Sequence, residues 1–149
     1  MNEPTYNEED LLDHHAIGAV IFDDKKRILM QEHLKYGFWT IPIGKIKKNQ
    51  EVLEGLKEEI FEECNLSINA CKEILVDGKD YLRNGKKIKV LNHIFLITNH
   101  SGELKNKEPE KHSQQKFIDL ETIKNFRYLS DATVMYLGSL GYRREALVT

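Results

Sequence analysis

Runs of apolar residues separated by polar turns predict strands on both sides of a central helix. A continuous apolar run over residues 16–22 and a second extended stretch over 27–33, separated by the charged segment 23–26, predict two strands joined as a hairpin. Asn84 and Gly85 form the strongest two-residue turn signal of the chain. The remaining predictions are strands at 72–76, 81–83, 90–98 and 116–120, and a long polar loop at 99–115.

The clearest periodicity predicts an amphipathic helix over residues 51–64. Apolar residues recur there at spacings of three and four, which places along one stripe Val52, Leu53, Leu56, Ile60, Phe61 and Cys64. Gly55 lies in the helix interior, where a glycine can mark close packing against a neighbour, and Asn65 is a candidate left-handed cap. Ser130 is a candidate N-cap for a closing helix that runs through residue 140.

Length and composition fit one compact domain. The 149 residues are 40% hydrophobic, and we expect a flexible acidic tail over residues 1–13 before a single domain over 14–149. The longest clean apolar runs, at 19–22 and 94–97, are far shorter than the ~18 residues of a membrane helix. We therefore predict a soluble, cytoplasmic protein with no membrane partner and with reduced cysteines. The net charge of -2 gives no reason to expect an extended nucleic acid as partner.

Four glutamates crowd onto one stretch of the predicted helix. Glu59, Glu62 and Glu63 are spaced i, i+3 and i+4, which places their side chains on one face. Glu58 lies four residues before Glu62, and like charges at such spacings destabilise a helix by roughly a few tenths of a kcal/mol per pair. A hard divalent cation would reverse that repulsion, because Mg²⁺ prefers oxygen ligands. The simpler alternative is a solvated acidic face.

The segment around these glutamates resembles the Nudix box of hydrolases that cleave a nucleoside diphosphate linked to a further group. That box has the pattern G-x5-E-x7-R-E-U-x-E-E-x-G-U, where U is a bulky aliphatic residue. The positions that match in register are Gly44, Glu59, Ile60, Glu62, Glu63 and Leu66. The positions that depart are Gln50 in place of Glu, Glu58 in place of Arg, Asn65 in place of Gly, and Ile43 in place of the first glycine of the usual Pro-Gly-Gly-Lys entry.

The resemblance covers roughly residues 14–140. A Trp39-x-x-Pro42 approach precedes the box, and the predicted strands follow in the family's order. The Glu-Pro-Glu-Lys sequence at 108–111 is similar to a loop of Nudix nucleoside-triphosphate diphosphatases. The resemblance implies an α/β fold, namely a Nudix-type α/β/α sandwich with a mixed β-sheet.

The resemblance also implies roles for individual residues. In the family, the glutamates that match Glu59 and Glu63 bind Mg²⁺ or Mn²⁺, and the backbone carbonyl that matches Gly44 can join them. The glutamate that matches Glu62 is a ligand or orients water, so the implied catalytic set is Glu59, Glu62 and Glu63. The base that deprotonates the attacking water stays open among Glu62, Glu108 and Glu110.

Three residues are expected to contact the nucleotide substrate: His33, Lys45 and Phe38. Lysines near the acidic helix can offset its charge and meet substrate phosphates, and the further candidates are Lys47, Lys48 and Lys57. Tyr36 and Phe38 can stack on a base. Trp39 can do the same, but core packing is its favoured interpretation.

The predicted function is metal-dependent hydrolysis of a nucleoside triphosphate to the monophosphate and pyrophosphate. The partner is therefore a small-molecule nucleotide, and a homodimer is compatible with this interpretation. The alternative substrates are ADP-ribose and dinucleoside polyphosphates. A further alternative is a degenerate domain that binds nucleotides without turnover, and the departures at Gln50 and Glu58 support it.

Overall fold

The computed structural model of the chain describes residues 5–142, and its strands form two sheets. The four-stranded sheet has the order β4-β1-β6-β5, with bounds Ile43–Lys45, His14–Val20, Lys86–Ser101 and Ser67–Arg83. In this sheet β1 and β6 are parallel and the other pairs antiparallel, so the sheet is mixed. The three-stranded antiparallel sheet has the order β3-β2-β7, with bounds Phe38–Thr40, Ile28–His33 and His112–Ile118.

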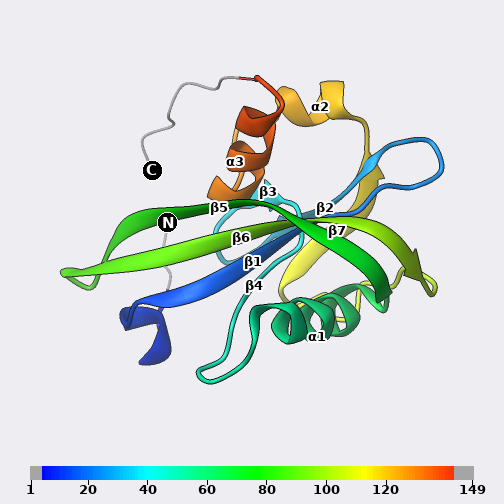
Figure 1. Ribbon diagram of the computed structural model, residues 1–149. Helices are drawn as coiled ribbons and strands as arrows, with labels where there is room; N and C mark the ends of the chain where they lie inside the picture. Colours follow the sequence, from blue (N-terminus) through cyan, green and yellow to red (C-terminus); the bar gives the residue numbers. More distant parts are fainter. Residues whose placement is uncertain (1–4, 143–149) are drawn as a thin grey trace.

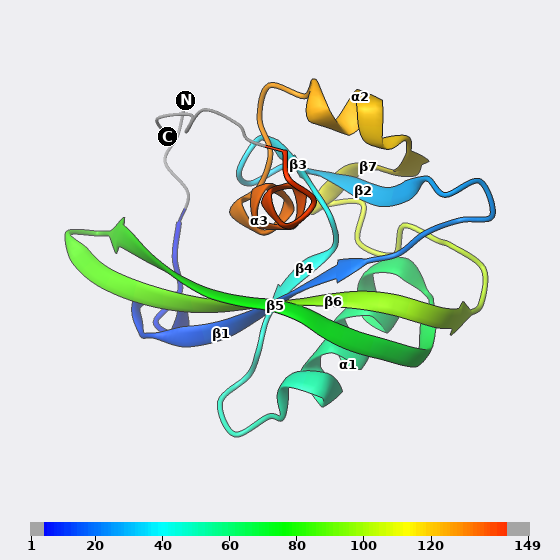
Figure 2. The same cartoon turned by 45° about the horizontal axis from the view of Figure 1, so that its top comes forward.

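Helices cover the sheets from two sides. Helix α1, Val52–Cys64, lies on one side, and α2, Leu120–Lys124, and α3, Asp131–Ser139, lie on the other, as Figures 1 and 2 show from two directions. A short 3-10 helix, η1, Glu9–Leu11, precedes β1. The predicted α/β/α sandwich with a mixed sheet is confirmed.

Each side of the sandwich has its own apolar core. The core beneath α1 includes Ile17, Ala19, Leu29, Leu56, Ile60, Cys64, Phe95 and Ile97. The core beneath α3 includes Val20, Met30, Ile41, Ile94, Ile123, Tyr136 and Leu137. Leu53 and Phe61 were expected in the buried stripe of α1 but are exposed, because only one face of the helix meets the sheets.

Local sequence signals explain where α1 and α3 begin and end. Asn65 adopts φ 63° as the left-handed C-cap of α1, and the hydroxyl of Ser130 accepts a hydrogen bond from the backbone N–H of Thr133 at the start of α3. A Cβ atom on Gly55 would lie 2.3 Å from Cδ1 of Ile46, in the loop before α1. The predicted caps and the predicted close packing at Gly55 are confirmed.

The predicted hairpin of the first two strands is wrong. Phe22 and Ile28 form one antiparallel bridge, and the backbone N–H of Leu29 donates to the carbonyl of Ile21 at 2.9 Å. Beyond these contacts β1 and β2 separate into different sheets. The partner of β1 is β6, which lies far along the chain, so long-range packing overrides the local hairpin signal.

Several other elements differ from the predictions. The strands predicted at 72–76 and 81–83 belong to one long strand, β5, which continues through the Asn84-Gly85 turn into β6. The predicted 99–115 loop is shorter, because β6 extends to Ser101 and β7 begins at His112. The sequence analysis missed the short elements β3, β4 and α2.

The N-terminal segment, expected to be a flexible tail, contacts the domain from residue 6 onward, where the ring of Tyr6 lies beside Lys35 and Arg83. Nζ of Lys45 lies 2.9 Å from Oδ1 of Asp10, and Nη1 of Arg83 donates to the carbonyl of Asp10 at 2.9 Å. Residues 1–4 of the predicted tail and 143–149 of the predicted domain lie outside the described residues. Among the described residues, none of the helices has the length and apolar character needed to cross a membrane.

Candidate metal and nucleotide site

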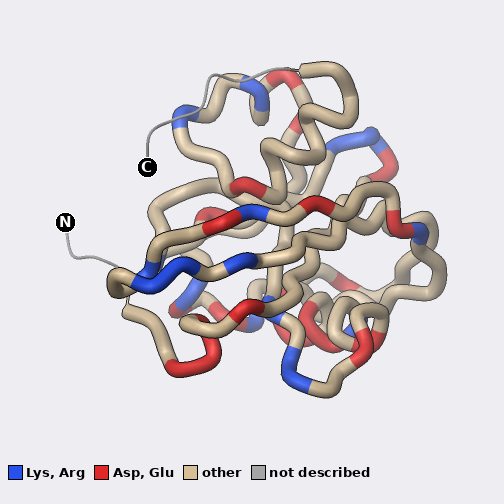
Figure 3. Tube along the Cα trace, turned by 60° about the vertical axis from the view of Figure 1, so that its left-hand side comes forward, with Lys and Arg blue, Asp and Glu red and all other residues tan. Residues whose placement is uncertain are grey.

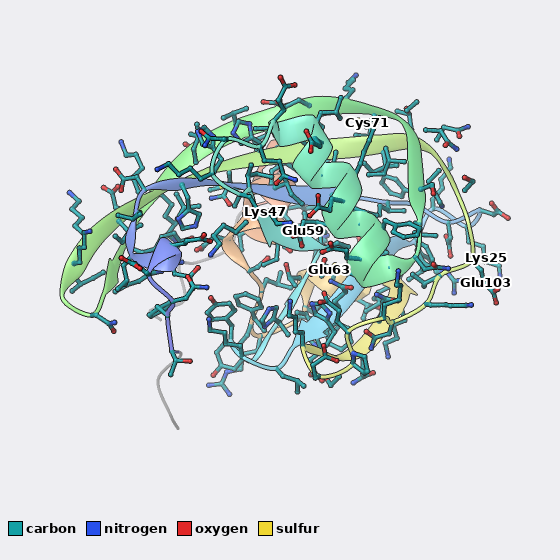
Figure 4. The ribbon with its side chains drawn as sticks, turned by 90° about the horizontal axis from the view of Figure 1, so that it is seen from below. Lys25, Lys47, Glu59, Glu63, Cys71 and Glu103 are labelled. Carbon is teal, nitrogen blue, oxygen red and sulfur yellow. The ribbon has the colours of Figure 1, made fainter. Side chains whose placement is uncertain are left out.

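Helix α1 presents its glutamates at three different depths. Glu62 is exposed, Glu59 is half-buried, and Glu63 retains only 5% of its accessible surface. Figure 4 shows Glu59 and Glu63 along α1, and Figure 3 shows acidic residues gathered on this helix with basic residues in the loop before it. The alternative of a solvated acidic face does not describe Glu63, because the loop before β7 covers the end of α1 that carries this residue.

Gly44 of β4 lies directly against the carboxylate of Glu59. A Cβ atom built on Gly44 would lie 2.6 Å from Cγ and 2.7 Å from Cδ and Oε2 of Glu59, distances that real Cβ atoms do not adopt. Gly44 is held in register opposite Ile17 of β1. The packing thus explains why a glycine is needed at this position, and it brings the backbone of Gly44 beside one of the predicted ligands.

Burial and mutual repulsion make the carboxylates of this site hard to ionise. Burial, followed by the charges of Glu62 and Glu108, raises the pKa of Glu59 to about 7. Burial, followed by the charges of Glu59 and Glu108, raises the pKa of Glu63 well above its ordinary value. Lys111 opposes both shifts, and its Nζ lies 3.1 Å from Oε2 of Glu108. The helix and the loop before β7 therefore form one acidic cluster, with Lys111 beside Glu108.

The side chain of His112 lies beside the carboxylate of Glu63, a contact that was not predicted from the sequence. Nε2 of His112 lies 3.7 Å from Oε1 of Glu63, and only 1% of the His112 side chain is exposed. The side-chain amide of Gln115 donates to the backbone carbonyl of Glu63 at 3.1 Å. His112 follows the Glu-Pro-Glu-Lys loop directly, but no spacing in the sequence links it to a helix residue so far away along the chain.

Two of the predicted nucleotide contacts lie in one aromatic cluster beside these glutamates. The ring centroid of His33 lies 5.8 Å from that of Phe38 and 5.3 Å from that of His112. Tyr36 completes the cluster at 4.9 Å from His33 and 5.2 Å from Phe38. Burial, followed by the charge of His112, lowers the pKa of His33 to about 4, so His33 is neutral at physiological pH. The cluster offers aromatic surface, and Nζ of Lys35 lies 5.2 Å from the ring centroid of Tyr36.

The other candidates are engaged elsewhere. Lys45 forms ion pairs with Asp10 and Glu9 of the N-terminal segment. Lys47 forms an ion pair with Glu58. Trp39 stacks on Phe126, with ring centroids 5.1 Å apart, in the core beneath α3, which supports its core interpretation.

Residues 12–136 of the chain match the NUDIX domain. The chain belongs to the NUDIX family. An 8-oxo-dGTP diphosphatase of Buchnera aphidicola subsp. Schizaphis graminum is 33% identical over 117 residues, which cover 77% of this chain and 83% of that protein. An 8-oxo-dGDP phosphatase of Danio rerio is 31% identical over 96 residues, which cover 61% of this chain and 27% of that protein, so the match spans about a quarter of the fish protein.

Solved structures agree with this assignment. The crystal structure of a MutT NUDIX hydrolase from Burkholderia pseudomallei gives a TM-score of 0.72 at 24% identity, covering 85% of this chain and 96% of that chain. At the level of the NUDIX family, the predictions of fold and of hydrolase activity on phosphoanhydride bonds are confirmed.

The residues of the NUDIX site fit a divalent cation by their chemistry. Among the described residues, Oε2 of Glu63 is buried without a hydrogen-bond partner, and the charges of Glu59 and Glu108 raise the pKa of Glu63 while Lys111 opposes that shift. Within residues 5–142 no three His, Cys, Asp or Glu side chains are already gathered around one point. Carboxylate and carbonyl oxygens are nevertheless the donors that Mg²⁺ and Mn²⁺ prefer, and such donors are present in Glu59, Glu63 and Gly44.

Proposed function

We propose that this NUDIX hydrolase cleaves a nucleoside triphosphate to the monophosphate and pyrophosphate in a reaction that requires Mg²⁺ or Mn²⁺. The observation that carries the proposal is the buried acidic cluster, in which Glu59 and Glu63 have raised pKa values and lie beside an aromatic cluster. Buried carboxylates that repel one another are costly to retain, and cation binding would offset that cost. The two relatives named for 8-oxo-dGTP and 8-oxo-dGDP favour an oxidised purine nucleotide among the substrates to test.

The proposed ligands are Glu59, Glu63 and the Gly44 carbonyl, with Glu62 as a further ligand or as a residue that orients water. A bound divalent ion would neutralise the phosphate charge and lower the pKa of the attacking water. Glu108 is the favoured base, because its charge acts on Glu59 and Glu63, whereas Glu110 is exposed and does not contribute to either shift. Glu62 remains the alternative base.

The remaining residues of the site would bind and orient the substrate. Lys111 opposes the raised pKa values of Glu59 and Glu63, and it can pair with a phosphate oxygen once Glu108 is engaged elsewhere. Tyr36, Phe38 and His33 present aromatic surface on which a base can stack. Lys45 can reach a phosphate only by exchanging its ion pair with Asp10.

A nucleotide panel tests this proposal. The purified chain is incubated with normal and 8-oxo nucleoside triphosphates and diphosphates, ADP-ribose and dinucleoside polyphosphates, with Mg²⁺, with Mn²⁺ or with EDTA. We expect metal-dependent release of monophosphate and pyrophosphate from a triphosphate, identified by chromatography. ADP-ribose as the best substrate would replace the proposed substrate class, and no turnover of any compound would favour a binding domain.

A further inference from the structure

Gln50 and Glu58, two of the residues at which the box departs from the family pattern, contact each other. Nε2 of Gln50 donates a hydrogen bond to Oε2 of Glu58 at 3.0 Å. Nζ of Lys47 forms an ion pair with Oε1 of the same carboxylate, so both oxygens of Glu58 have a partner. Figure 4 shows Lys47 beside the same helix that carries Glu59. Both oxygens of Glu58 are therefore held from the loop side, while the charge of Glu58 still contributes to the raised pKa of Glu59.

Gln50 uses both ends of its side-chain amide. The backbone N–H of Lys47 donates to Oε1 of Gln50 at 3.1 Å, and the backbone N–H of Gln50 donates to the carbonyl of Lys47 at 3.0 Å. Asn49 adopts φ 66° within this turn, a conformation that asparagine tolerates. An ionised glutamate at position 50 would still accept from Lys47 but would have no hydrogen to donate to Glu58. Gln50 and Glu58 are therefore suited to each other.

Packing holds the same loop against α1. A Cβ atom on Gly55 would lie 2.3 Å from Cδ1 of Ile46 and 3.0 Å from Oε1 of Gln50. Ile46 is buried, and its backbone N–H donates to the carbonyl of His15 at 2.9 Å. The loop begins directly after β4, which contains Gly44, so the position of the loop on α1 determines where Gly44 meets Glu59.

We propose that Lys47, Gln50 and Glu58 form a clamp that holds the loop after β4 on α1 and thereby positions Gly44 beside Glu59. In the family pattern the acidic residue lies at position 50 in the loop and the basic residue at position 58 on the helix. The anion now comes from the helix and the donors come from the loop. These are positioning residues, which act on the metal site through Gly44 and Glu59. The inference rests on the proposed metal-dependent function, but it also concerns cation binding in the absence of any nucleotide.

The test removes the clamp without changing the net charge. Gln50→Met keeps the length of the side chain and deletes both hydrogen bonds. Binding of Mn²⁺ alone is measured by titration calorimetry and by electron paramagnetic resonance on the nucleotide-free protein. We expect about tenfold weaker binding, the range found when residues that support metal ligands are removed. The matched control is Glu54→Gln on the exposed side of the first turn of α1, which should bind Mn²⁺ as the wild type does.

A reversed pair supplies the second arm. Glu58→Arg alone loses the acceptor of Gln50 and places a cation beside Lys47, so we expect it to bind Mn²⁺ at least about tenfold more weakly. Gln50→Glu combined with Glu58→Arg can form an ion pair of the opposite polarity and should return to within about threefold of the wild type. Circular dichroism and melting curves on every variant identify any loss of folding.

Two results would overturn the clamp. One is wild-type Mn²⁺ binding by Gln50→Met, and the other is a double variant that binds as weakly as Glu58→Arg alone. A failure of the proposed function is distinguishable from both, because it appears as absence of turnover in the nucleotide panel while the Mn²⁺ titrations still follow the expected order.

Discussion

Replacing Glu59 by glutamine should stabilise the metal-free protein at pH 8 but not at pH 5. The folded protein raises the pKa of Glu59 from its ordinary value of 4.5 to about 7. A carboxyl whose pKa is higher in the folded state binds more protons there than in the unfolded state. Its contribution to stability is therefore complete below pH ~4.5 and is lost as the pH rises through about 7.

The size of the effect follows from the shift. The difference between 4.5 and about 7, at about 1.4 kcal/mol per pKa unit, sets an upper bound on the order of 3 kcal/mol. Glu59 is only partly buried, so solvent screening reduces the expected gain of Glu59→Gln at pH 8 to about 1–2 kcal/mol. Near pH 4.5 the neutral glutamine and the protonated glutamate should be nearly equivalent.

Urea unfolding in EDTA at pH 5 and pH 8 measures this difference, with Glu54→Gln as the exposed control. Adding Mg²⁺ or Mn²⁺ at pH 8 should stabilise the wild type by mass action and should stabilise Glu59→Gln much less. The reasoning is refuted if wild type and Glu59→Gln lose stability in parallel between pH 5 and pH 8. It is also refuted if the variant is the less stable protein in EDTA at pH 8.

Four further substitutions test the site by different routes. Glu62→Gln and Glu63→Gln should each lower turnover at least ~100-fold on the best substrate while the protein stays folded. Wild-type rates in both variants would mean that these glutamates only form a solvated helix face. Gly44→Ala should displace the Glu59 carboxylate, so Mn²⁺ binding should weaken with little change in melting temperature; unchanged binding would argue against Gly44 at the site. His112→Phe should keep the ring volume but weaken Mn²⁺ binding about tenfold, and unchanged binding would leave His112 a packing role.

Helix α1 and its caps were predictable because their signals are local. Apolar spacing along the helix and Asn65 at its end act within a few residues, so no knowledge of the rest of the chain is needed. The partner of β1 was not predictable in this way. The segment that follows β1 has the pattern of a hairpin, but β6, some seventy residues later, supplies the parallel neighbour.

The same difference between local signals and long-range contacts applies to the candidate site. The resemblance to the box predicted Gly44, Glu59 and Glu63 as site residues, because a match in register carries positions directly. The burial of Glu63 and its contact with His112 depend on how the loop before β7 packs on α1, which no spacing in the sequence reports. For the same reason the ion pair between Lys45 and Asp10 was not foreseen, since it joins β4 to the segment before β1.

The residues that depart from the box supported the alternative of a degenerate domain. Their contacts in the structure argue against that alternative. Asn65 adopts the left-handed conformation that the glycine of the box would adopt, and its side chain donates to the carbonyl of Glu103 at 2.9 Å. Gln50 and Glu58 are hydrogen-bonded to each other, and Lys47 forms an ion pair with the Glu58 carboxylate, so both departing residues have partners in the loop before α1 or on the helix. Random loss of function would replace positions independently, whereas these replacements are complementary. A box that keeps its loop seated on α1 and its acidic cluster intact is what a hydrolase that still turns over its nucleotide requires.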